Sequence, residues 1–160
     1  MSRLDTFISR MSAQRDILNH VAHDLGLPPE GAILEVGLGN GRTYSHLRQL
    51  FPDRRIVAFD RALNAHRTTL PQGDDFVLGE INETGRNFAG SEAALVHADI
   101  GTGYPESEAV IMSWLPQIVA DMLQSGGVAV SGLSLSHPQL QELQRLPTVE
   151  EGRYHMYRKI

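Results

Sequence analysis

The sequence contains no cysteine. A disulfide framework, a zinc site built on thiolates and a cysteine nucleophile are therefore excluded. Lysine occurs once, at Lys159, and there is no dense block of lysine and arginine. Because the net charge at pH 7 is −5, a nucleic-acid backbone is an unfavourable partner. The charge balance thus favours a small molecule over DNA or RNA.

Long apolar runs are also missing, since none approaches the roughly 20 residues that cross a bilayer. The most apolar stretch, residues 109–123, is interrupted by polar side chains and a proline. Charged residues near the N-terminus leave no apolar segment of the kind found in signal peptides. We therefore predict no membrane association and a cytoplasmic location. A homo-oligomer is compatible with the sequence.

The chain of 160 residues is 41% hydrophobic and 21% charged, which is typical of a single folded domain. Apolar residues recur at helical spacing near the N-terminus, and Gly26 is a natural stop for that helix. Pro28 and Pro29 then separate it from the rest of the chain. We predict one domain over residues 1–160, with a helical cap at 1–26 and a sheet core at 31–160.

The most informative stretch is Glu35–Gly41, with the sequence EVGLGNG, directly after the apolar run 32–34. This order predicts a strand, a tight glycine-rich loop and a helix that begins near Arg42. Glycine allows positive φ and lets a ligand approach the main chain closely. The helix directs unpaired N–H groups towards the loop. The stretch therefore predicts a binding site for a nucleotide-like molecule.

Further strands and helices alternate along the rest of the chain. The predicted strands are Ile56–Phe59, Phe76–Leu78, Ala94–Ala98, Val128–Val130 and the tail Arg153–Ile160. The predicted helices cover residues 42–51, 62–69 and 109–123, and a further helix begins at Ser136. The helix over 109–123 is expected to kink or restart at Pro116 and to be closed by Gly126–Gly127. Gly152 could turn a hairpin from Thr148–Val149 into the tail. This alternation predicts an α/β fold: an open, mostly parallel twisted sheet with helices on both faces and an antiparallel C-terminal strand.

The glycine spacing separates two kinds of nucleotide site. The dinucleotide fingerprint needs a third glycine five residues after the first, but Arg42 or Tyr44 stands there. The acid Glu35, one residue and then Gly-x-Gly-x-Gly resemble the first motif of class I S-adenosylmethionine-dependent methyltransferases. Asp60, which ends the next strand, suits the two hydroxyls of a ribose. The resemblance covers most of the chain from Gly31 onwards and implies the Rossmann-like methyltransferase fold.

The resemblance implies S-adenosylmethionine as the cofactor and assigns residues to it. The glycine loop and Glu35 would lie near its methionine part, Asp60 would hold the ribose and Glu80 would face the adenine. Asp99, which ends the fourth strand, would lie beside the methyl-transfer zone. The predicted binding residues are Glu35, Gly37, Leu38, Gly39, Asn40, Gly41, Thr43, Asp60, Arg61, Gly79, Glu80, Ile81, Asp99 and Ile100.

Each of these acids also has a structural explanation. Asp60 or Glu80 could open a following helix, and Asp99 could shape a turn. His97, inside an apolar strand, is better explained as a hydrogen-bonded core residue than as a base. Asp99 is the candidate catalytic residue, and His97 and Tyr104 are the other candidate bases.

Departures from methyltransferase subfamilies narrow the acceptor. Without cysteine, covalent C5-cytosine methylation is excluded, and Asp99 is not followed by the Pro-Pro-aromatic motif of amino-methylating nucleic-acid enzymes. The fifth strand is followed by Ser131–Ser134 rather than by metal ligands, so we predict no metal. We predict metal-independent methyl transfer to a small-molecule acceptor. The alternatives are a non-catalytic binder of S-adenosylmethionine or S-adenosylhomocysteine, acting as a sensor or partner subunit, and an NAD(P)-dependent oxidoreductase.

Overall fold

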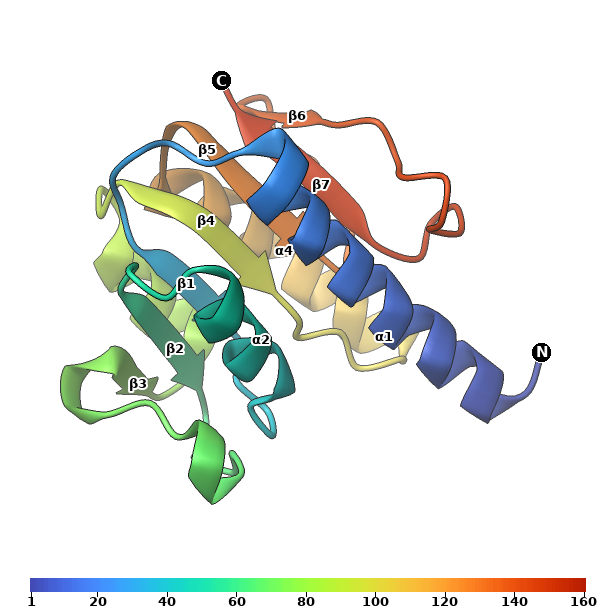
Figure 1. Cartoon of the computed structure of the whole chain (residues 1–160), viewed down its shortest axis with the longest axis horizontal. Coiled ribbons are helices and arrows are strands. Elements are labelled where there is room, and N and C mark those ends of the chain that lie inside the picture. Colours follow the sequence, from blue (N-terminus) through green and yellow to red (C-terminus); the bar gives the residue numbers. More distant parts are fainter.

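A computed structural model describes residues 1–160 and contains one seven-stranded sheet (Figure 1). The strand order is β3-β2-β1-β4-β5-β7-β6. The first five strands run parallel, and β7 is antiparallel to both β5 and β6. The strands are β1 Ile33–Val36, β2 Ile56–Asp60, β3 Phe76–Leu78, β4 Ala93–Ala98, β5 Leu123–Ser131, β6 Leu140–Glu142 and β7 His155–Lys159. The predicted fold class is confirmed, including the antiparallel C-terminal strand.

Helices cover both faces of this sheet. The main helices are α1 Arg3–His20, α2 Arg42–Leu50 and α4 Pro105–Met122, and α3 Ile81–Thr84 is a single turn. α1 continues as a π-helical turn over Val21–Leu25 and ends at Gly26, where φ is +78°. A capping box between Ser2 and Asp5 starts α1.

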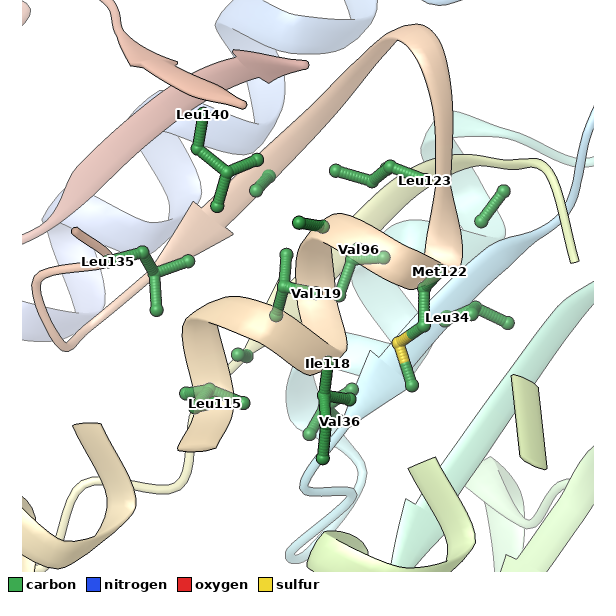
Figure 2. Close-up of a cluster of buried hydrophobic side chains, with 14 of the residues drawn as sticks. Leu34, Val36, Val96, Leu115, Ile118, Val119, Met122, Leu123, Leu135 and Leu140 are labelled. Carbon is green, nitrogen blue, oxygen red and sulfur yellow. The ribbon is translucent and has the colours of Figure 1, made fainter. Parts of the chain in front are cut away.

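The central strands are buried on both faces because their side chains feed two separate apolar clusters. One cluster joins β-strand side chains to α4, where Ile118, Val119 and Met122 pack towards Leu34 and Val96 (Figure 2). The other joins the opposite face of the sheet to α1 and α2. This explains why β1, β2 and β4 are mostly apolar and do not alternate, with Glu35 and His97 as the buried polar exceptions in β1 and β4.

Two predicted helices are wrong. Residues 62–69 form only a 3-10 turn at Arg67–Thr69, and Leu63 there is exposed, so no apolar face exists to dock a helix. The segment after Ser136 forms strand β6 instead, because Leu140 is buried and its strand pairs with β7. The predicted hairpin between Thr148–Val149 and the tail is also wrong, because β7 pairs with β5 and β6 instead.

The boundary between α4 and β5 also differs from its prediction. α4 runs through Pro116 without a break and ends at Met122, and β5 begins at the next residue. The pair Gly126–Gly127 therefore lies inside β5, not at the helix end. Gly126 has φ of +84°, beside the register shift between β4 and β5. The glycines accommodate this irregularity of the strand.

Only part of the apolar face of α1 is buried in the core. Leu4, Phe7 and Ile8 are 66%, 47% and 53% exposed, because the N-terminal half of α1 projects beyond the sheet (Figure 1). The C-terminal half supplies Ile17 and Leu18, which are buried in the core.

Candidate functional site

The glycine loop forms the centre of the candidate site, between β1 and α2. The N–H groups of Gly37 and Leu38 donate to the Phe59 carbonyl, so the loop is fixed to β2. Gly37, Gly39 and Gly41 all have positive φ. The position of a Cβ on Gly39 has no atom within 4 Å, so the main chain there is open to a ligand.

At Gly37 the loop packs tightly against the segment after β4. A Cβ there would lie 2.6 Å from Ile100 Cγ2 and 2.8 Å from the Asp99 carbonyl oxygen. The two predicted segments, 37–41 and 99–100, are therefore in direct contact. Only glycine permits this approach with φ of +95°.

A cavity of about 230 Å³ opens beside the loop. Its walls come from α1, the glycine loop, the start of α2 and the end of β4. They are formed by Phe7, Arg10, Met11, Gln14, Gly37, Leu38, Gly39, Asn40, Arg42, Thr43 and Asp99. A second cavity of about 290 Å³ between α1 and α2 shares Phe7, Met11, Gln14, Arg42 and Thr43 with the first. The predicted residues Gly37–Asn40, Thr43 and Asp99 thus line one space, whereas Gly41 faces Thr69 instead.

Asp60 lies at the end of β2 next to the loop. Its Oδ2 accepts the Gly39 N–H at 2.9 Å, and its Oδ1 accepts the Arg61 N–H at 2.7 Å. Each carboxylate oxygen has a second lone pair, so Asp60 can still accept hydroxyl donors. The structure therefore places Asp60 against the loop and gives it no role as a cap of a following helix.

Gly79, Glu80 and Ile81 follow β3, the next strand along the edge. The Gly79 N–H donates to the Asp60 carbonyl at 3.0 Å. The Glu80 side chain is 64% exposed and lies 4.0 Å from Arg61 Nη1, whereas Ile81 is buried in the α4-side core. Glu80 also precedes α3, and its carbonyl accepts the N–H groups of Glu83 and Thr84. Asp60, Arg61 and these three residues all lie outside the walls of the 230 Å³ cavity.

Asp99 is the acid that lines the cavity. Its Oδ2 accepts Gln14 Nε2 at 2.8 Å and lies 3.6 Å from Arg10 Nη2. Both partners are on α1, which the sequence resemblance did not cover. Their role was missed because nothing in the sequence indicates which face of α1 meets the end of β4.

Glu35 is placed in the interior, beneath the loop. Its register partner on β4 is His97, and Oε1 accepts the His97 Nδ1 hydrogen at 2.5 Å. Glu35 Oε2 is buried without a hydrogen-bond partner. Glu35 does not line the 230 Å³ cavity. An acid and a histidine in two neighbouring apolar strands are a signal that could have predicted this pair.

A chain of buried hydrogen bonds continues from this pair to Asp99. His97 Nε2 bonds the Tyr154 hydroxyl at 2.6 Å, and Gln14 Nε2 donates to the same hydroxyl at 3.0 Å. The chain thus runs Glu35–His97–Tyr154–Gln14–Asp99, through two strands, the segment before β7 and α1. His97 is a hydrogen-bonded core residue, as predicted, with no exposed surface. Because His97 is fully buried, a substrate cannot reach it, and it cannot act as a base. Tyr104, the other candidate base, is 73% exposed.

Burial and neighbouring charges shift the pKa values of three residues in this hydrogen-bond chain. Burial raises the pKa of Glu35, although His97 acts in the opposite direction. Burial alone lowers the pKa of His97, but the carboxylates of Glu35 and, to a smaller extent, Asp99 together outweigh it, and the net pKa is raised. Burial also raises the pKa of Tyr154 well above its ordinary value. The Tyr154 hydroxyl therefore stays protonated and can donate or accept in the chain.

The sequence profile of a family described as S-adenosyl-L-methionine methyltransferase matches residues 1–159. The chain belongs to this family. Its structure superimposes on the crystal structure of an S-adenosyl-L-methionine methyl transferase from Silicibacter pomeroyi DSS-3 with a TM-score of 0.89 and 38% identity, covering 99% of both chains. This methyltransferase therefore uses S-adenosylmethionine, and the nicotinamide and non-catalytic alternatives are set aside.

More distant structures share the fold alone. TrmN from Thermus thermophilus gives a TM-score of 0.67 at 18% identity, covering 92% of the methyltransferase and 48% of TrmN. A probable spermidine synthase from Corynebacterium glutamicum ATCC 13032 gives 0.61 at 13% identity, covering 94% of the methyltransferase and 63% of the synthase. No curated protein sequence matches. Neither of the two 18-residue helices, α1 and α4, has the hydropathy of a transmembrane segment.

Proposed function

We propose that this methyltransferase moves a methyl group to a small-molecule acceptor without a metal ion, and binds its cofactor at the carboxyl ends of β1 to β4. The observation that carries the proposal is the 230 Å³ cavity shared by the glycine loop, Thr43 and Asp99. Ligands of open α/β sheets bind at this edge. The proposed cofactor site consists of Gly37–Gly41, Thr43, Asp60, Arg61, Gly79–Ile81, Asp99 and Ile100, with Glu35 beneath the loop.

The residues of this site fit S-adenosylmethionine. The open main chain at Gly39 permits a close approach of the ligand. At the start of α2 the Arg42 N–H donates to Asn40 Oδ1, but the N–H groups of Thr43 and Tyr44 have no acceptor in the protein and suit a carboxylate. Asp60 has lone pairs to spare for a ribose. Asp99 has an oxygen, Oδ1, that accepts no hydrogen bond from the protein, which suits an ammonium group.

Bound S-adenosylmethionine supplies a methyl group activated by a positively charged sulfur. The protein's part is alignment and exclusion of water, because the transfer is a direct displacement. Such a displacement needs no metal, and the chain brings no three His, Asp or Glu side chains together as a metal site. The position of Asp99 between Gln14 and Arg10 favours cofactor binding over its predicted role as a base.

Two features support a small acceptor. The adjoining cavity of about 290 Å³ lies just below the roughly 300–1,000 Å³ that small-molecule sites occupy, which leaves room only for a small acceptor. The chain is also acidic overall, with a net charge of −5, which disfavours nucleic acid.

The acceptor class is tested by incubating the protein and labelled S-adenosylmethionine with separate fractions of metabolites, nucleic acid and protein, with and without a chelator. We expect label in the metabolite fraction, unchanged by the chelator. Label in the nucleic-acid or protein fraction, or loss of transfer with the chelator, would contradict the proposal.

The cofactor site is tested with Asp60→Asn, which removes the charge next to the glycine loop. A hydrogen bond to a charged group contributes about 1.5–3 kcal/mol, so we expect S-adenosylhomocysteine to bind roughly 10- to 150-fold more weakly in calorimetry. Asp53→Asn, an exposed residue before the start of β2, is the matched control. Equal affinity of Asp60→Asn and wild type would refute the ribose contact.

A further inference from the structure

Arg10 of α1 has hydrogen-bonding capacity that the protein does not use. Its Nη2 lies 3.6 Å from Asp99 Oδ2, beyond an ordinary hydrogen bond, and its Nε is buried without any partner. A guanidinium carries five N–H donors in a planar fork. The side chain lines the same 230 Å³ cavity as the glycine loop. Arg10 therefore presents an underused positive group to the proposed cofactor site.

Asp99 presents the opposite charge across the same cavity. Gln14 is 5% exposed, and its Nε2 donates both to Asp99 Oδ2 at 2.8 Å and to the Tyr154 hydroxyl at 3.0 Å. Asp99 Oδ1 accepts no hydrogen bond from the protein. The buried chain thus fixes one carboxylate oxygen and leaves the other for a ligand.

A positive and a negative group a few ångströms apart match the two charged groups of an α-amino acid. The methionine end of the cofactor carries this combination of a carboxylate and an ammonium. The planar fork of arginine suits a carboxylate, with which it forms two parallel hydrogen bonds. A carboxylate such as Asp99 suits the ammonium.

We propose that α1 completes the cofactor site: Arg10 binds the carboxylate of the methionine end, Asp99 accepts its ammonium, and Gln14 and Tyr154 position Asp99. This inference rests on the proposed function, because it requires the cofactor at the glycine loop. It assigns the N-terminal helix a direct part in binding. The projection of α1 beyond the sheet places it along this edge (Figure 1).

The test compares two probes that share the adenosine and the sulfur. S-adenosylhomocysteine carries the amino-acid group, and 5′-deoxy-5′-methylthioadenosine lacks it. For Arg10→Gln we expect S-adenosylhomocysteine to bind about tenfold more weakly or worse, with methylthioadenosine within about twofold of wild type. Asp99→Asn should show the same selectivity. Calorimetry measures both affinities without any acceptor.

Arg3→Gln is the matched control, because Arg3 is exposed on the same helix and lines neither the cofactor cavity nor the adjoining 290 Å³ cavity. It should leave both affinities unchanged. Equal weakening of both probes by Arg10→Gln, or no weakening of either, overturns the inference while the proposed function stands. If wild-type protein binds neither probe, both fail. Circular dichroism verifies folding, which we expect to persist because the Arg10 side chain is 42% exposed.

Discussion

Replacing Glu35 by Gln should reverse the pH dependence that His97 contributes to stability. In the wild-type protein the Glu35 carboxylate raises the pKa of His97 above its ordinary 6.5. The folded state then retains a proton that the unfolded state loses as the pH rises past about 6.5. The free energy of unfolding therefore falls with rising pH until folded His97 also titrates. Its steepest slope is about 1.4 kcal/mol per pH unit for one proton.

In the Glu35→Gln variant the carboxylate is gone and burial dominates the pKa of His97, which should fall below 6.5. The sign then reverses: the unfolded state binds more protons than the folded state, so this contribution to stability rises with pH towards 6.5. Gln has nearly the same shape and keeps an oxygen to accept the His97 Nδ1 hydrogen. The comparison therefore changes charge with little change in packing.

The assay is urea unfolding, followed by the fluorescence of Trp114, for both proteins between pH 5.5 and 8.5. Other groups also contribute to the pH dependence, including His46, whose pKa is lowered by burial. Such contributions cancel when the unfolding free energy of the variant is subtracted from that of wild type. The raised pKa of Glu35 itself remains in the difference and has the same sign, because folded Glu35 retains a proton that the unfolded state has lost. We expect this difference to fall as the pH rises, with a slope of up to about 1.4 kcal/mol per pH unit for each proton. A flat or rising difference would refute the buried proton shared by Glu35 and His97.

Two further substitutions test the loop and the buried chain. Gly37→Ala should lower the unfolding free energy by about 2 kcal/mol or more, because φ is positive and the new Cβ would clash with Ile100. Gly39→Ala, where φ is also positive but the space is open, should lower it by about 1 kcal/mol. Similar losses for the two variants in urea unfolding would contradict the tight packing at Gly37. Tyr154→Phe should lower the unfolding free energy by about 1–3 kcal/mol, because Gln14 and His97 lose their hydrogen bonds to the hydroxyl. Tyr104→Phe, at an exposed position, should change it by no more than about 0.5 kcal/mol. Equal losses would refute the buried hydrogen-bond chain.

The sheet core was predictable because its strands are buried on both faces. Continuous apolar runs such as Ile56–Phe59, each ending in glycine or an acid, give both the strands and their carboxyl ends. The glycine loop was predictable because its motif consists of residues that are close together in the sequence. These features depend on neighbouring residues and not on distant partners.

The C-terminal region was less predictable because its structure depends on long-range pairing. Leu140 and Leu143 fit a helix by spacing, but β6 forms because β7 offers it a strand edge. The partners of Asp99 were missed for a related reason. Gln14 and Asp99 are 85 residues apart, and only the docking of α1 brings them together.

The most direct test of the account is a crystal structure of the protein with S-adenosylhomocysteine. We predict the adenosine beside Asp60 and the glycine loop, and the amino-acid end between Asp99 and Arg10. Binding elsewhere, or an amino-acid end turned away from Asp99 and Arg10 into solvent, would contradict it.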